Sequence, residues 1–192
     1  MNKSRLEAFS DGVIAVIITI MVLEVKVPHG SDLSAVYPVL PVLLSYVLSF
    51  IFVGIYWNNH HHLMLATRRI GAGVMWANLH LLFWLSLVPV LTGWVGQNPL
   101  APWPTALYGA LLLCVGLAWL VLQRAIIARN GKDSALARAI GSDAKGNASA
   151  VLYLVAIALA FVRTWAADLV YATVALIWLV PDRRIAAQLE DD

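Results

Sequence analysis

The sequence predicts an all-α integral membrane protein whose single domain, residues 1–192, contains six transmembrane helices per subunit. Of its residues, 61% are hydrophobic and only 12% are charged, whereas a soluble domain carries about 25% charged residues. The mean hydropathy is +0.79. A chain of 192 residues has room for about six spans of roughly 20 residues. The apolar stretches are continuous, which favours helices over barrel strands, whose residues alternate.

Polar residues and prolines separate the six apolar stretches. Residues 28–34 separate the first two, and the prolines of segment 99–104 separate the third from the fourth. Segment 128–147 is polar and contains three glycines, so we expect a surface linker there. Residues 163–164 join the last two stretches as a tight hairpin. The spans are expected at roughly 9–27, 34–57, 73–96, 103–124, 147–162 and 165–180.

The basic residues predict the orientation, because cytoplasmic loops carry an excess of Lys and Arg. With a cytoplasmic N-terminus, only Lys26 and Arg163 of the 13 basic residues fall outside. The others fall inside: Lys3, Arg5, Arg68, Arg69, Arg124, Arg129, Lys132, Arg138, Lys145, Arg183 and Arg184. This bias predicts an even number of spans and a multi-pass protein of the cell (inner or plasma) membrane, with both termini and linker 128–147 in the cytoplasm.

The net charge and the cysteine content argue against a nucleic-acid partner and exclude an intrachain disulfide. The net charge is only +2, and the basic residues are scattered rather than gathered on a stripe, so no nucleic-acid partner is expected. The single cysteine, Cys114, lies in an apolar run, which excludes an intrachain disulfide. The high hydrophobic content makes the lipid bilayer the main surrounding of the chain.

Asp11 is an ionisable residue inside an apolar stretch, where a charge is expensive. In one interpretation Asp11 and Ser10 only satisfy backbone donors in the first helical turn and complement the helix dipole. In the other, Asp11 belongs to a buried polar network that holds the inner end of this helix against its neighbours. Candidate partners at the same depth are Arg5, Trp57, His60 or His61, and Asn78.

Three consecutive histidines, His60 to His62, invite a metal hypothesis. Successive helical residues point about 100° apart, so one cation could not easily collect all three. We therefore predict no metal site and no cofactor, and expect one or two of the histidines to form structural hydrogen bonds. A contribution to pH sensing is the alternative, because histidine titrates near neutral pH.

Gly12, Val16, Thr19 and Leu23 follow one another at helical spacing and share one face of the first helix. If several copies met around an axis, this face would form rings of Val16 and Leu23 with a hydroxyl ring between them. Such a hydrophobic constriction gates by dewetting, and hydroxyl groups partly replace the hydration shell of an ion. The alternative is an ordinary lipid-facing or packing face, since Val and Leu occur in any span.

The first half of the chain resembles the prokaryotic branch of the transmembrane protein 175 family, the lysosomal and endosomal potassium channels. The residues that carry the resemblance are Arg5-Leu-Glu-Ala-Phe9-Ser10-Asp11-Gly12-Val13, followed by Ala15, Thr19, Leu23 and Glu24, then Trp57-x-x-His60-His61, Asn78 and Ser86-Leu-Val-Pro89. The first of these segments is similar to the family signature Arg-x-x-x-Phe-Ser-Asp.

The resemblance implies a homotetramer with the first helix of each subunit around a central pore that passively conducts potassium and other monovalent cations. It implies a hydrophobic gate lined by Val16, Thr19 and Leu23, and no re-entrant loop; the sequence contains no Thr-Val-Gly-Tyr-Gly-like filter. Where the family often has Ile or Leu, Val16 predicts a wider, less selective ring. The structural network behind the pore helix would consist of Arg5, Phe9, Ser10, Asp11, Trp57, His60 and Asn78.

Two other classes of function compete with a channel. A proton- or metal-coupled transporter would use Asp11 and the His60–His62 cluster, but transporters commonly show repeated halves with broken helices near the midplane. Here the polar residues gather near the inner surface. A membrane-embedded enzyme would need a second carboxylate or a nucleophile at the depth of Asp11, and the sequence offers none there, so no enzymatic activity is predicted.

Overall fold

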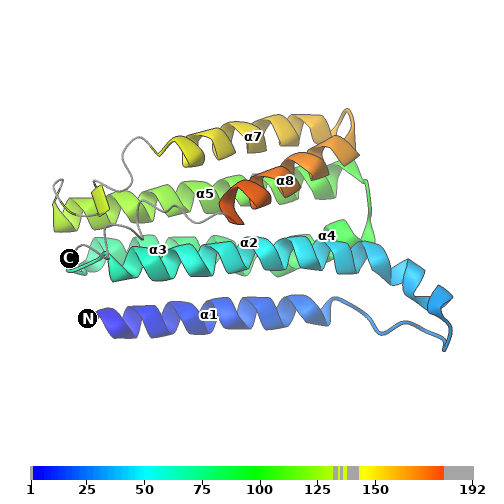
Figure 1. Ribbon diagram of the computed structural model, residues 1–192, viewed down its shortest axis with the longest axis horizontal. Coiled ribbons are helices and arrows are strands. Elements are labelled where there is room, and N and C mark those ends of the chain that lie inside the picture. The colour runs from blue at the N-terminus through cyan, green and yellow to red at the C-terminus, as the bar shows by residue number, and fades with distance from the viewer. Residues whose placement is uncertain (1, 132–133, 135, 138–142, 180–192) are drawn as a thin grey trace.

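The computed structural model describes residues 2–131, 134, 136–137 and 143–179. Within these residues every regular element is a helix, and no strand is present. The helices lie side by side along one long axis, with α1 (Lys3–Leu23) at one edge of the bundle and α7 (Ala144–Ala160) at the other (Figure 1). We call the end that holds the N-terminus the proximal end, and the opposite end the distal end.

The first two long helices run in opposite directions. α1 begins six residues before its apolar run, because Asn2 caps it by accepting a hydrogen bond from the backbone N–H of Ser4 at 3.4 Å. The short helix η1 (Leu33–Val39) leads directly into α2 (Leu40–Leu65), and Pro41 stands in the first turn of α2, where no backbone donor is needed. α2 continues through the three histidines to Leu65.

The third apolar stretch forms two consecutive helices, α3 (Ala72–Ser86) and α4 (Val88–Gln97). They meet at Leu87, just before Pro89, which has no backbone donor to continue the ladder of α3. α5 (Pro102–Asn130) is the longest helix, and α7 and α8 (Thr164–Leu179) form a hairpin beside it. Most of the expected linker between α5 and α7, including Lys132 and Arg138, lies outside the described residues, as do Arg183 and Arg184.

Two apolar cores hold the bundle together. The larger one joins the inner side of α1 to α2, α3, α4 and α5, and the smaller one joins α5, α7 and α8 around buried tyrosines. The described chain contains four helical segments that are long and apolar enough to cross a bilayer: Lys3–Leu23, Leu33–Leu65, Ala72–Gln97 and Pro102–Asn130. α7 and α8 are shorter apolar helices. The chain is therefore a helical membrane protein.

Gly96 allows α4 to pack directly against α2. A Cβ atom at Gly96 would lie 2.7 Å from the Cα atom of Val42, which as a backbone atom cannot rotate away. We expect Gly96→Ala to lower the free energy of unfolding by about 1 kcal/mol or more, measured as a lower melting temperature of the purified protein. Gly54→Ala is the matched control, because an added Cβ there meets nothing within 4 Å. Equal melting temperatures for the two variants would contradict the close packing of α2 and α4.

Candidate functional site

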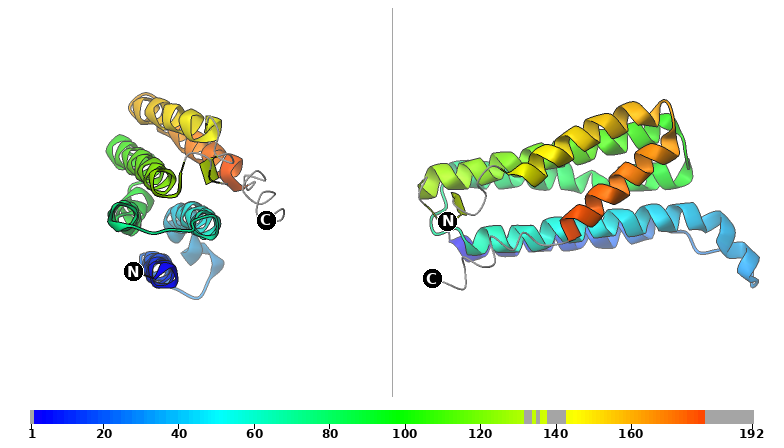
Figure 2. Two further views of the ribbon diagram at one scale, coloured as in Figure 1. Left: turned by 90° about the vertical axis from the view of Figure 1, so that its left-hand side faces the viewer. Right: turned by 45° about the horizontal axis from the view of Figure 1, so that its top comes forward.

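One face of α1 has no partner among the residues that the structure describes. Val16 is 54% exposed and Leu23 is 77% exposed, and Gly12 and Thr19 are exposed as well. The end-on view in Figure 2 shows why: α1 lies at the edge of the bundle, with the other helices on one side of it only. The residues of α1 that point into the bundle are Leu6, Ser10, Ile14, Ile17 and Met21. At about 100° per residue, the Gly12 to Leu23 stripe runs along the middle of the free face.

The only polar side chain on this stripe is oriented by its own helix. The hydroxyl of Thr19 donates a hydrogen bond to the carbonyl oxygen of Val16 at 2.9 Å. A hydroxyl has one proton and two lone pairs. The proton of Thr19 is used within α1, and the lone pairs of its oxygen remain available to a group in front of the face. This is the arrangement that suits a cation rather than an anion.

Behind the free face, three buried polar side chains join α1, α2 and α3. Asn78 donates through Nδ2 to the Ser10 hydroxyl at 2.9 Å, and Ser10 donates to the carbonyl of Leu6 at 2.8 Å. The Oδ1 atom of Asn78 lies 2.8 Å from Nε2 of His60. Because an amide oxygen can only accept, His60 carries its proton on Nε2. All three side chains are buried, with exposed fractions of 0–1%, so each depends on its partners for hydrogen bonds.

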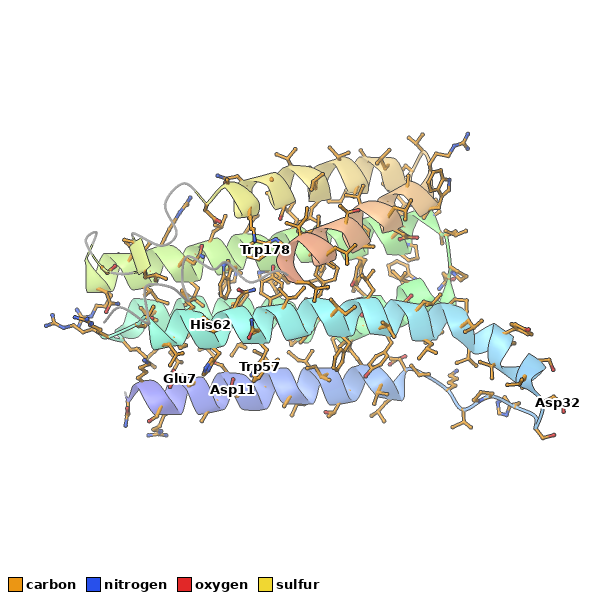
Figure 3. All side chains as sticks on the ribbon, viewed as in Figure 1. Glu7, Asp11, Asp32, Trp57, His62 and Trp178 are labelled. Atoms are coloured by element: carbon orange, nitrogen blue, oxygen red, sulfur yellow. The ribbon has the colours of Figure 1, made fainter. Side chains whose placement is uncertain are left out.

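A second polar contact joins α1 to α2 on the surface of the subunit. The indole Nε1 of Trp57 donates to Oδ1 of Asp11 at 3.0 Å, and Figure 3 shows the two residues between the facing sides of α1 and α2. Asp11 is exposed and Trp57 is 47% exposed. Asp11 is therefore held apart from the buried group of Ser10, Asn78 and His60.

Arg5 and Phe9 belong to neither group. Both are exposed, and Phe9 is 52% exposed. The side chain of Arg5 has no hydrogen bond or ion pair to any residue that the structure describes. The seven residues expected to form one network thus divide into a buried trio, a surface pair and two unpaired side chains on the open side of α1.

The three histidines have different surroundings. His60 lies in the buried trio, His61 is exposed, and His62 is half-buried with no hydrogen-bond partner for its Nδ1 atom. The rings of His61 and His62 are 5.7 Å apart. Across ranges 2–131 and 143–179 and the described residues between them, no three His, Cys, Asp or Glu side chains are close enough to share a metal ion.

Asp168 is an ionisable residue within α8 that the interpretation of the polar residues did not include. It lies in the second turn of the helix and is half-buried. The signal that identifies it is the one that identified Asp11, a single carboxylate inside an apolar stretch. It lies near the distal end of the bundle, far along the axis from the proximal polar groups.

Known proteins resemble this chain, one of them over its whole length. Residues 5–89, which contain the free face of α1 and both polar groups, match the family described as endosomal/lysosomal potassium channel TMEM175. The chain is 50% identical over 192 residues to a potassium channel of Chryseobacterium sp. (strain P1-3), and the match covers 100% of both chains. It is also 37% identical over 81 residues to the endosomal/lysosomal proton channel TMEM175 of Homo sapiens, which covers 36% of this chain and 16% of the human protein.

A solved structure resembles the fold as well. The crystal structure of a lysosomal potassium-selective channel TMEM175 homolog from Chamaesiphon minutus matches with a TM-score of 0.77 and 28% sequence identity. The match covers 94% of this chain and 97% of the other. Together with the full-length relative and the matched segment of α1 to α3, it shows that the chain belongs to the TMEM175 family of ion channels.

Proposed function

We propose that the chain is a subunit of a potassium-selective channel in which the α1 helices of four copies surround a central pore. The observation that carries this proposal is the unpartnered face of α1, which is apolar except for one hydroxyl and is backed by a buried polar group. The names of the relatives support conduction of potassium, and the free face supports α1 as the element that lines the path. No enzymatic step is part of this function.

The stripe on α1 would form a constriction with three levels. Val16 and Leu23 are separated by about 10 Å along the helix axis, and Thr19 lies between them, about 4.5 Å from the level of Val16. Four copies would place two apolar rings around the pore with an oxygen ring between them. Narrow apolar rings exclude water and so close the path, while the oxygen ring partly replaces the hydration shell of an ion that passes.

The buried trio gives α1 a defined rotation about its own axis. Ser10 lies on the side of α1 opposite to the stripe, and Asn78 and His60 hold it from α3 and α2. A rotation of α1 by one residue, about 100°, would break these bonds and turn Val16 away from the axis. The trio is thus a structural support for the pore and does not touch the ion.

Thr19→Val is expected to weaken the preference for potassium over sodium. Valine has nearly the shape of threonine but no oxygen, so the middle ring would lose the lone pairs that face the path. We expect a drop of about threefold or more in the permeability ratio, measured from reversal potentials. Thr173→Val is the matched control, since that exposed threonine also donates to its own helix but lies in α8. An unchanged ratio in Thr19→Val would remove the hydroxyl ring from the conduction path.

We also infer that all six apolar stretches cross the membrane and that both termini lie in the cytoplasm. α7 has 17 residues and α8 has 16, which at 1.5 Å per residue gives about 24–26 Å, close to the hydrocarbon thickness of about 30 Å. The described basic residues near the proximal end are Lys3, Arg5, Arg68, Arg69, Arg124, Arg129 and Lys145, against Lys26 and Arg163 near the distal end. By the positive-inside rule the proximal end faces the cytoplasm.

Reconstitution of the purified protein in planar bilayers tests the function. With potassium on one side and sodium on the other, unitary currents should reverse near the potassium equilibrium potential. A pH gradient at equal potassium should leave the reversal potential unchanged. Electroneutral or substrate-dependent flux without unitary currents would point to a transporter, and a reversal that follows the pH gradient would point to proton conduction; either result would contradict the proposal.

A further inference from the structure

A cavity lies near the distal end of the bundle, away from the face of α1 that would line the pore. It opens between α2, α4, α5 and α8, has a volume of about 580 Å³, and no residue of α1 lines it. Small-molecule sites usually have volumes of about 300–1,000 Å³ and mostly apolar walls with a few polar groups. This cavity fits that description, because leucines and prolines from α2 and from the segment after α4 make up half of the residues that line it.

Asp168 is the only charged residue among the described residues that line the cavity. It is half-buried, and its side chain has no hydrogen bond or ion pair to the described part of the chain. A carboxylate in an apolar helix is costly unless it has a partner. A partner from outside the subunit would remove that cost, and the cavity is the space that such a partner would occupy.

Three tyrosines line the cavity together with this carboxylate. Tyr108 and Tyr171 both line the cavity, and their rings are 5.8 Å apart in an edge-on arrangement. Their hydroxyl groups are already used, because Tyr171 donates to the carbonyl of Thr105 at 3.0 Å and Tyr108 lies 2.8 Å from the Ser49 hydroxyl. A third ring, that of Tyr37, lines the cavity and is 70% exposed. Tyr108 is 4% exposed and Tyr171 is 1% exposed, so Tyr37 supplies most of the ring surface that an occupant would meet.

We propose that this cavity binds a lipophilic organic cation, with the positive charge at Asp168 and the apolar part on the rings and the leucine wall. An aromatic surface beside a carboxylate attracts such a cation both by charge and by its ring quadrupole. A potassium ion is a poor occupant, because apolar walls cannot replace its hydration shell. A zwitterionic phospholipid is also a poor one, since its phosphate would meet no basic residue among the residues that line the cavity.

Binding of tritiated tetraphenylphosphonium to the full-length protein in phosphatidylcholine nanodiscs tests this inference, with empty nanodiscs as background. We expect saturable binding that equimolar KCl does not displace, and a loss of affinity of about tenfold or more in Asp168→Asn. Asp32→Asn is the matched control, because Asp32 is exposed and does not line the cavity. Thr19→Val should also bind normally, which separates this site from the pore. The measurement needs no current, so its result does not depend on conduction.

Asp168→Asn should leave the stability of the fold unchanged. Asn at position 168 keeps the shape of the side chain, and the Asp168 carboxylate has no partner to lose among the described residues, so the variant should melt no lower than the wild type. Should it fail to fold, Tyr37→Leu, at an exposed ring of the cavity, should reduce affinity about threefold or more.

Equal binding by Asp168→Asn, equal saturable binding of the anion tetraphenylborate, or displacement by phosphatidylethanolamine would overturn the proposal. So would a change of oligomeric state in Asp168→Asn without any binding of the cation.

Discussion

Asn78→Leu is expected to lower the free energy of unfolding of the subunit by about 2–4 kcal/mol. The substitution removes two interhelical hydrogen bonds at once, to Ser10 and to His60. It also leaves the Nε2 proton of His60 buried without an acceptor, and an unsatisfied buried donor costs more than a lost hydrogen bond contributes. The loss should appear as a lower melting temperature and a smaller monodisperse peak in size-exclusion chromatography.

A double substitution separates the hydrogen bond from the packing at this position. In His60→Leu/Asn78→Leu both members of the α2–α3 pair become apolar, so no unpaired imidazole proton remains. We expect the double variant to be more stable than the sum of the two single variants predicts, by about 1 kcal/mol or more. Strictly additive losses would show that these side chains act as space-filling groups and not as a network. Trp57→Phe, which removes only the surface bond to Asp11, should cost much less.

Val16→Ala and Leu23→Ala are each expected to raise the single-channel conductance by about twofold or more. Both substitutions shorten an apolar side chain on the free face of α1, so a ring of four would widen and hold water more easily. Wider rings also discriminate less between hydrated ions, so the permeability ratio of potassium to sodium should fall. Unitary currents at several voltages and reversal potentials in mixed salts measure both effects.

The control for these variants is an apolar residue that is equally exposed in the subunit but lies on another helix. Val151 in α7 is 60% exposed, and Val151→Ala should leave conductance and selectivity unchanged. If Val16→Ala and Leu23→Ala also leave the currents unchanged, the stripe does not line the pore, and its exposure in the subunit has to be explained by lipid contact.

Hydropathy located the helices but did not locate their ends. The apolar run begins near residue 9, whereas α1 begins at Lys3 because Asn2 caps it. α2 likewise continues beyond residue 57 to Leu65. Its polar end stays helical because Leu63 and Met64 are buried there in the larger core. Hydropathy reports where a chain meets lipid, while caps and core packing decide where a helix ends.

The site residues could be selected from spacing and depth, but their pairing could not. Ser10, His60 and Asn78 lie at similar depths on three helices, which is visible in the sequence. Which histidine points inward depends on the rotation of α2, and packing against α4 and α1 determines that rotation. For the same reason Asp11 pairs with Trp57 and stays out of the buried trio. Asp168 shows the same signal as Asp11, but its neighbours in the cavity come from α2, α4 and α5, and the sequence alone does not bring these helices together around it.

The free face of α1 has a consequence for the biogenesis of the protein. Lipid tails are as apolar as Val16 and Leu23, so a newly inserted subunit can remain in the bilayer with this face uncovered at little cost. Thr19 adds little to that cost, because its proton is already bonded within the helix. Lipid therefore gives no hydrophobic force that would gather the subunits of the proposed channel, and shape and polar contacts have to do so. By mass action, the share of subunits in assembled channels should then rise with their density in the membrane.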